Sequence, residues 1–294
     1  MDFVEVVRRR RTTNGHFTDE PVSAADQRLL MELAGRAPSQ LNSQPWRFVL
    51  VEARETIDEI ARISGESMTE SMSSGTFFER YKPFFRFSAA EMARHRDGML
   101  FDKLPAPLRP FTKQVFTRRG QLLMNALRVP QTLGAENRAL VAGSPLLLGV
   151  MLDRSSYRPD SLTSFYSTFS MAAAMENVWL ATVPLGLGIQ FISFPMESPA
   201  RWAEVSALLK VPDDLELMAV YRIGHVPPER VRPAIDWVSD ERKRISQYVF
   251  REDATTPQTG WDEPPGGDVP PGRDEPPGQD EPPGRAGPAV PPGA

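Results

Sequence analysis

Two short segments of the sequence collect side chains that bind ligands more readily than they pack a core. Residues 38–46 read PSQLNSQPW and place amide and hydroxyl side chains between two prolines. Residues 8–15 read RRRRTTNG and join arginines to hydroxyls and an asparagine. Guanidinium groups form bidentate, charge-assisted hydrogen bonds to phosphate, and hydroxyls and backbone amides can bond the remaining oxygens. The arginine segment is therefore a candidate phosphate site, with Arg230 and Arg232 of RVRP as a second basic pair.

The arginine segment also permits simpler interpretations. Four consecutive arginines are common at a solvated helix end and occur in nucleic-acid-binding patches. The sequence alone leaves these alternatives open.

The composition limits which chemistry the chain can perform unaided. It has no cysteine, which excludes disulfides, thiolate metal sites, iron–sulfur clusters and cysteine nucleophiles. Its three histidines, His16, His95 and His225, are scattered, so we expect no metal site. The GLG at residues 186–188 lacks the third glycine of a dinucleotide fingerprint. Difficult chemistry would therefore have to come from a bound cofactor.

The size and charge are those of an ordinary soluble protein. The 294 residues are 40% hydrophobic and 24% charged, and no apolar run approaches the ~18 residues of a membrane span. The charges of MDFVEVVRRRR follow its apolar stretch, the reverse of a secretory signal. We therefore predict a cytoplasmic protein with no membrane partner. From Asp262 onward seven acids and two arginines give −5, which leaves +1 for the rest of the net −4.

The end of the chain is predicted to be a separate, disordered segment over residues 252–294. It repeats DEPPGG, DVPPGR, DEPPGQ and DEPPGR, and it lacks the aliphatic residues that could offset the entropy of ordering it. A solubilising tail is the favoured interpretation, and a proline-rich docking segment is the alternative.

The preceding residues, 1–251, are predicted to form one α+β domain. Helices are expected from Phe3 into the arginines and after Ser23, where Asp26 completes a capping box. A long helix from Phe165 to Thr182 is apolar or small almost all round, which predicts a buried element. A short helix is expected from Ser198 or Pro199 to a point before Pro212. Strands are expected at Arg47–Val51, Leu146–Leu152, Ile189–Phe194 and Leu217–Ile223. This order favours a sandwich over a regular βαβ alternation.

Residues 64–140 interrupt that pattern and are predicted to be a helical insertion without a clear strand. Their most conspicuous stretch is FFERYKPFFRF, in which aromatic and basic residues alternate in clusters. Such aromatics could line a substrate pocket, although they are more often core or subunit interface.

Five segments together resemble the FMN-dependent nitroreductase family. They are RRTTNGHF, APSQLNSQPWRF, MAAAMENVWLA, LGLGIQF and the final RVR, in the order in which that family has them. The resemblance covers residues 3–63 and 141–238, and APSQLNSQPW is its most specific part. It implies a sandwich with a central, mostly antiparallel sheet flanked by helices. The family commonly has a further basic residue just before the phenylalanine that is Phe17 in this chain. This chain departs from the family by having Gly15 and His16 there.

The resemblance also implies which residues hold FMN. The phosphate would be bound by the first turn and by the last arginines, the polar loop would lie along the flavin, and a segment after the third strand would lie near the isoalloxazine. The cofactor-binding residues so implied are Arg10, Arg11, Thr12, Asn14, Pro38, Ser39, Asn42, Gln44, Phe191, Ile192, Ser193, Arg230 and Arg232. Candidate substrate residues in the insertion are Tyr81, Phe84 and Arg86.

The expected activity is a two-step reduction in which NAD(P)H reduces FMN and a nitroaromatic, a quinone or a similar small electron-poor acceptor then takes the electrons. No catalytic side chain is assigned, because the flavin would carry the chemistry. A homodimer is implied, with FMN at the interface and contacted by both chains. Two alternatives remain. GLGIQFISF also resembles flavin destructases, and dehalogenases share the same fold. A basic nucleic-acid or protein-binding module without catalysis is the alternative of another class.

Overall fold

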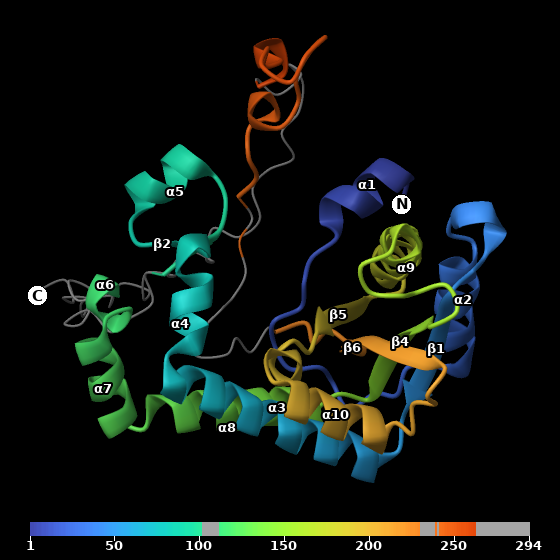
Figure 1. Cartoon of the computed structure of the whole chain (residues 1–294), viewed down its shortest axis with the longest axis horizontal. Coiled ribbons are helices and arrows are strands. Elements are labelled where there is room, and N and C mark those ends of the chain that lie inside the picture. Colours follow the sequence, from blue (N-terminus) through green and yellow to red (C-terminus); the bar gives the residue numbers. More distant parts are fainter. Residues whose placement is uncertain (102–111, 230–238, 240, 263–294) are drawn as a thin grey trace, which may run out of the picture. The chain divides into compact units, whose positions relative to one another are not determined.

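A computed structural model describes residues 1–101, 112–229, 239 and 241–262 of the chain (Figure 1). Its contacts divide the chain into two units, Met1–Glu241 and Arg242–Ala294. In the described part no helix is both long enough and apolar enough to cross a membrane.

The first unit is built on a four-stranded sheet. Its strands are β1 (Trp46–Val51), β4 (Leu146–Asp153), β5 (Leu187–Phe191) and β6 (Leu215–His225). Their order is β1-β4-β6-β5, and each neighbouring pair is antiparallel. The predicted α+β class and antiparallel sheet are thus confirmed.

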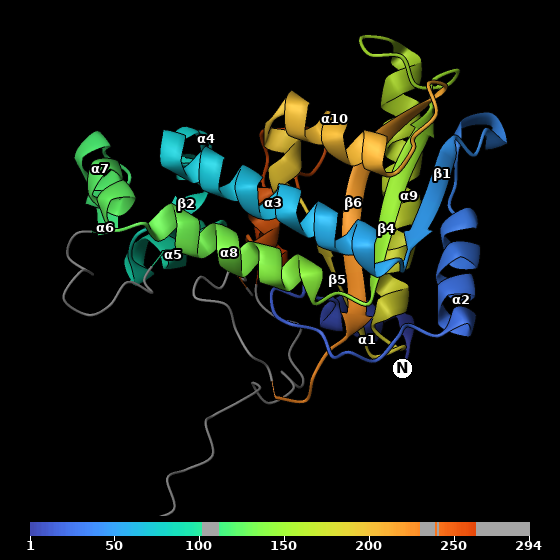
Figure 2. The same cartoon turned by 90° about the horizontal axis from the view of Figure 1, so that it is seen from below.

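Helices cover both faces of this sheet (Figures 1 and 2). On one face lie α2 (Ala24–Gly35) and α9 (Leu162–Thr182), and on the other lie α3 (Arg54–Ser74), α8 (Val129–Ala142) and α10 (Pro199–Leu208). Ser23 caps α2 by accepting from the backbone N–H of Asp26, as predicted. Ser161 and Ser198 cap α9 and α10 in the same way.

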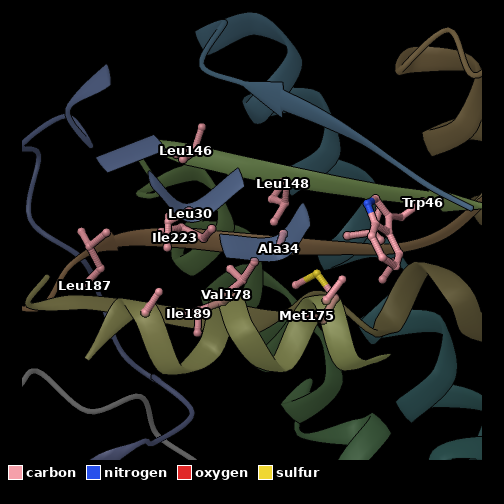
Figure 3. Close-up of a cluster of buried hydrophobic side chains, with 14 of the residues drawn as sticks. Leu30, Ala34, Trp46, Leu146, Leu148, Met175, Val178, Leu187, Ile189 and Ile223 are labelled. Carbon is pink, nitrogen blue, oxygen red and sulfur yellow. The ribbon is translucent and has the colours of Figure 1, made fainter. Parts of the chain in front are cut away.

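Side chains of β4 alternate between two hydrophobic clusters. Leu146, Leu148 and Val150 pack against α2 and α9 (Figure 3), whereas Leu147 and Met151 pack against α3 and α10. This is the period of two expected of a strand buried on both faces. A register shift opposite Val150 and Met151 places a β-bulge in β6, between Leu217 and Ala219. The bulge lets Leu217 and Val220 face the same cluster.

Two predicted elements differ from those observed. The strand expected at Ile189–Phe194 is β5, Leu187–Phe191, and Phe194 begins the 3₁₀ helix η4 (Phe194–Glu197), because Ser193 is already helical and Pro195 cannot continue a ladder. The long helix α9 is not buried all round. Its first turns expose Phe165 and Phe169, at 57% and 67% of their surface.

The insertion begins and ends inside the two long helices α3 and α8. Its elements are α4 (Thr76–Tyr81), η2 (Lys82–Phe84), β2 (Phe85–Arg86), α5 (Ala89–His95), β3 (Met99–Leu100), α6 (Thr112–Val115) and α7 (Arg118–Ala126). β2 and β3 form a parallel pair of two residues each, too short to leave a periodic pattern in the sequence. Phe77, Phe78 and Phe85 are buried in a third cluster with Met68 and Leu133.

In the second unit the described residues form a small turn structure. It holds η5 (Ile245–Gln247), η6 (Thr259–Trp261) and a bridge between Phe250 and Pro257. Ser246 donates to the carboxylate of Asp262. The predicted disordered tail, residues 252–294, thus begins within this turn, and from residue 263 it lies outside the described residues.

Helices α3 and α8 cross so closely that glycine is required at the crossing. A Cβ atom at Gly65 would lie 2.7 Å from the carbonyl oxygen of Gly134 and 2.8 Å from the Cβ of Arg138. We expect Gly65→Val to lower the free energy of unfolding by about 1–3 kcal/mol through overpacking. Chemical denaturation would measure this. Gly35→Ala is the control, because no atom lies within 4 Å of its added Cβ, and a destabilisation equal to that of Gly65→Val would contradict the crossing argument.

Candidate functional site

A cavity of about 350 Å³ lies among the end of β5, helix α8 and the insertion. This volume is within the range of small-molecule sites. Its apolar lining comes mainly from α8 and from the aromatic residues of the insertion. Its polar lining consists of Asn14, Tyr81, Glu136, Asn137, Gln190, Ser193, Glu197 and Arg222. Apolar walls with some polar groups are typical of small-molecule binding sites.

The segment after α1 (Phe3–Arg9) brings Asn14 to this cavity. The backbone N–H of Thr13 donates to the carbonyl of Ile189 at 3.0 Å, so the segment runs along β5. It can approach because Gly188 has no side chain: a Cβ there would lie 2.4 Å from the Thr13 hydroxyl. Asn14 is 2% exposed and accepts from the Gln190 amide at 3.2 Å.

The predicted phosphate residues of the arginine segment, Arg10, Arg11 and Thr12, lie just before Asn14 and do not line the cavity. The guanidinium of Arg10 stacks over Trp179 of α9, with its carbon 5.2 Å from the ring centroid. Arg11 is exposed and donates to the carbonyls of Arg8 and Arg10. Thr12 is half-buried between Arg11 and Thr13. Arg230 and Arg232 lie outside the described residues.

The polar loop has an unusual backbone. Leu41, Asn42 and Gln44 have φ values of 48°, 54° and 44°, in the left-handed region that costs most residues of order 1–3 kcal/mol. The Gln44 N–H donates to the Ser39 hydroxyl at 3.1 Å, and its side-chain amide donates to Asn42 Oδ1 at 3.0 Å. Such strain tends to occur at functional sites.

The loop nevertheless does not contribute to the cavity of its own chain. None of Pro38, Ser39, Asn42 and Gln44 lines it. Pro38, Asn42 and Gln44 are exposed, and Leu41 presents 95% of its surface to solvent. Within the described residues, the predicted cofactor residues therefore form three groups. The first is at the cavity, with Asn14, Phe191, Ile192 and Ser193, the second is the loop, and the third is the arginine segment just before Asn14.

A polar cluster joins the insertion to the 3₁₀ helix η4. Tyr81 donates its hydroxyl to the carboxylate of Glu197, which also pairs with Arg80. Burial raises the pKa of Tyr81, and the nearby Glu197 carboxylate raises it further. Phe77 stacks on Phe194 with the ring centroids 5.8 Å apart. These contacts join α4 to η4.

Of the three predicted substrate residues, two line the cavity and one does not. Tyr81 and Phe84 line the cavity, and Phe84 is 60% exposed. Arg86 does not line it, because its guanidinium pairs with Asp97 and donates to the carbonyls of Pro83 and Phe85. An Arg86 that attracts acceptors is therefore not supported by its position.

Arg222 of β6 is a cavity residue that sequence reasoning missed. It is 1% exposed, and it donates to Gln190 and to the carbonyls of Leu140, Thr13 and Gly15. Its guanidinium lies 4.6 Å from the Phe17 ring centroid. Burial lowers its pKa to about 9. Its signal in the sequence is a lone charge within the apolar strand LMAVYRIG.

Asn137 and Gln190 were missed as well. Asn137 on α8 donates to the Ser64 hydroxyl at 2.7 Å, and Gln190 joins Asn14 to Arg222. Both are single amides within helical or strand sequence, a pattern that gives no functional signal of its own.

Comparison with known proteins identifies the family. Residues 7–225 match the model of the nitroreductase family, which is more than half of the chain. The iodotyrosine deiodinase of Thermotoga neapolitana is 25% identical over 225 residues, which cover 76% of this chain and 88% of that protein. A putative NAD(P)H nitroreductase of Bacillus subtilis, YdgI, is 29% identical over 73 residues, 25% of this chain and 35% of that protein.

A putative NADH oxidase from Clostridium acetobutylicum aligns with a TM-score of 0.48 at 16% identity, covering 84% of this chain and 99% of that one. The matched residues 7–225 include the arginine segment, the polar loop, β5 and Arg222. As its sequence motifs predict, the chain belongs to the nitroreductase family, a family of FMN-binding oxidoreductases.

Proposed function

We propose that this protein binds FMN in the cavity beside Asn14 and uses NAD(P)H to reduce a small, electron-poor acceptor. The observation that carries the proposal is the cavity itself, in a chain of this family. Leu133, Leu140 and Val141 give it an apolar wall, and Asn14, Asn137 and Gln190 supply amides that could bond the polar edge of a flavin ring.

The arginine segment supports the same assignment for the phosphate. Arg10 and Arg11 lie a few residues from Asn14, and at this point two basic side chains accompany the hydroxyls of Thr12 and Thr13. A bound FMN would supply the two-electron chemistry, and the chain's own residues would bind and orient it and exclude water.

The polar loop supports a homodimer in which each cavity is completed by the partner subunit. The loop holds a strained conformation, does not line the cavity of its own chain and is open to solvent. Helix α9 exposes Leu162, Phe165, Tyr166 and Phe169, and α1 exposes Phe3, Val4 and Val7. Exposed apolar side chains of this kind are typical of an interface between subunits.

We expect the purified protein to show the visible spectrum of bound flavin, with one FMN released per chain on denaturation. A colourless protein that takes up no added FMN would contradict the proposal and would favour the non-catalytic binding module.

Mixed dimers test whether the loop acts on the partner's site. Ser39→Ala/Asn42→Ala in one subunit and Asn14→Ala in the other should each reduce FMN content in their own homodimers. Coexpressed with two different tags, they form a dimer in which one site carries both defects and the other carries neither. We expect about half of the wild-type FMN content in that dimer. If the loop acted within its own chain, both sites of the mixed dimer would be defective and no FMN would be regained.

The acceptor class has two candidates. Nitroaromatics and quinones are planar and fit an aromatic-lined cavity mouth. Reductive removal of a halogen from a phenol is the second candidate, favoured by the similarity to the Thermotoga deiodinase over most of its length. Nitroaromatics, quinones and halogenated phenols can be compared side by side in steady-state kinetics.

Phe84 tests whether the insertion selects among them. It lines the cavity and is 60% exposed, so it can contact an acceptor. We expect Phe84→Ala to change kcat/KM by about tenfold for at least one acceptor, about 1.4 kcal/mol, while the rate of flavin reduction by NAD(P)H stays constant. Leu122→Ala is the control, because it lies on α7 of the same insertion, is 64% exposed and does not line the cavity. Equal losses for every acceptor, or the same loss in Leu122→Ala, would make the insertion structural.

A further inference from the structure

Arg222 carries a positive charge into the interior, where no described residue gives it a negative partner. It is the largest of the fully buried side chains in the described part of the chain. All its hydrogen bonds go to neutral oxygens: the Gln190 amide and the carbonyls of Leu140, Thr13 and Gly15. Among the described residues, no carboxylate lies within ion-pair distance of it. Burying an unpaired charge costs several kcal/mol, so this position needs an explanation.

Within the part of the chain that the structure describes, one N–H of the guanidinium also has no hydrogen-bond partner. Nε makes one hydrogen bond, Nη1 one and Nη2 two, so four of its five N–H groups are used. Arg222 lines the cavity, and within the described residues it is the only cation that does so. The cavity is therefore the place where a negative charge could compensate it.

The acidic side chains around the cavity would oppose a negative charge there. Glu136 and Glu197 are acids, and Tyr81 is neutral at physiological pH. The charge of Glu197 is already balanced by Arg80. A fully buried guanidinium is screened less by water than either partly exposed acid, so its field is the stronger one inside the cavity.

We propose that Arg222 is a charge-balancing residue that stabilises the reduced, anionic form of the cavity's occupant more than the oxidised form. This inference rests on the proposed function. Hydride transfer from NAD(P)H gives the neutral flavin ring two electrons and one proton, and NAD(P)⁺ leaves. The ring thus gains one negative charge unless a second proton follows, and the buried guanidinium compensates that charge.

The alternative is a purely structural role. By holding the carbonyls of Thr13 and Gly15, Arg222 also fastens the segment that carries Asn14. A structural role would change the affinity for oxidised and reduced flavin equally, so the reduction potential would not move. Stabilisation of the anion changes the ratio of the two affinities.

The experiment compares Arg222→Met and Arg222→Lys with the wild-type protein. FMN content is measured first, because absence of FMN from the wild type would reject the proposed function and not the role of Arg222. For Arg222→Met we expect reduced FMN to lose about tenfold more affinity than oxidised FMN, a midpoint potential about 30 mV lower for the two-electron couple. The pH at which the reduced flavin takes up its second proton should rise by about one unit. Arg222→Lys keeps the charge, so its midpoint potential and the pH of its second protonation should lie close to those of the wild-type protein.

Two results would overturn the proposal. One is an Arg222→Met protein that binds FMN with an unchanged potential. The other needs no variant, and so applies even if the substitution prevents folding. If the wild-type protein takes up two protons for every two electrons at pH 8, its reduced flavin is neutral and Arg222 compensates no charge.

Discussion

Strand β4 buries side chains on both of its faces, and the arrangement of the domain follows from that constraint. Leu146, Leu147, Leu148 and Leu152 are each 0% exposed. Full burial of a leucine contributes about 1.5–3 kcal/mol, so these four contribute as much as the whole net stability of a typical domain, about 5–15 kcal/mol. Neither face of the strand can therefore be left open. Strands β1 and β6 must flank it, and helices must cover the sheet on both sides.

The bulge in β6 determines which hydrophobic cluster Leu217 joins. Without it, Leu217 would point to the same face as Ala219 and Ile223, toward α2 and α9. The shift lets Leu217 pack with Val220 against α3 and α10. Beyond the bulge the strand alternates regularly, so Arg222, two residues after Val220, lies on that same face. There it reaches the carbonyl of Leu140 on α8 and those of Thr13 and Gly15.

The sequence predicts the regular elements well and the site only in part. Continuous apolar runs such as Leu146–Leu152, and capped helices such as α2, appear as predicted, because local pattern and burial agree there. The bounds of β5 were wrong by two or three residues, because left-handed Gly186 and helical Ser193 set its limits. Exposure of Phe165 and Phe169 on α9 was missed, since an apolar pattern cannot distinguish a core from the surface of a lone chain.

The site residues that sequence reasoning missed share one property: each acts through contacts made far away in the chain. Arg222 bonds residues more than 200 positions earlier, and Asn137 bonds Ser64. Short motifs such as PSQLNSQPW are visible because their polar groups are adjacent in sequence. By contrast, the contacts within one chain explain only part of the conformation of this loop. The loop satisfies its own amides and accepts strain at Leu41 and Gln44, but it does not line the 350 Å³ cavity of its own chain.

The insertion and the sheet framework both contribute residues to the lining of the cavity. Its aromatic cluster is joined to the framework by few elements: the ends of α3 and α8, the Phe77–Phe194 stack and the contacts of Tyr81 and Arg80 with Glu197. The residues that line the cavity from the framework side, such as Asn14, Gln190 and Arg222, belong to the sheet and the segment laid along it. Substitutions in the cluster can therefore reshape the mouth of the cavity without disturbing its floor.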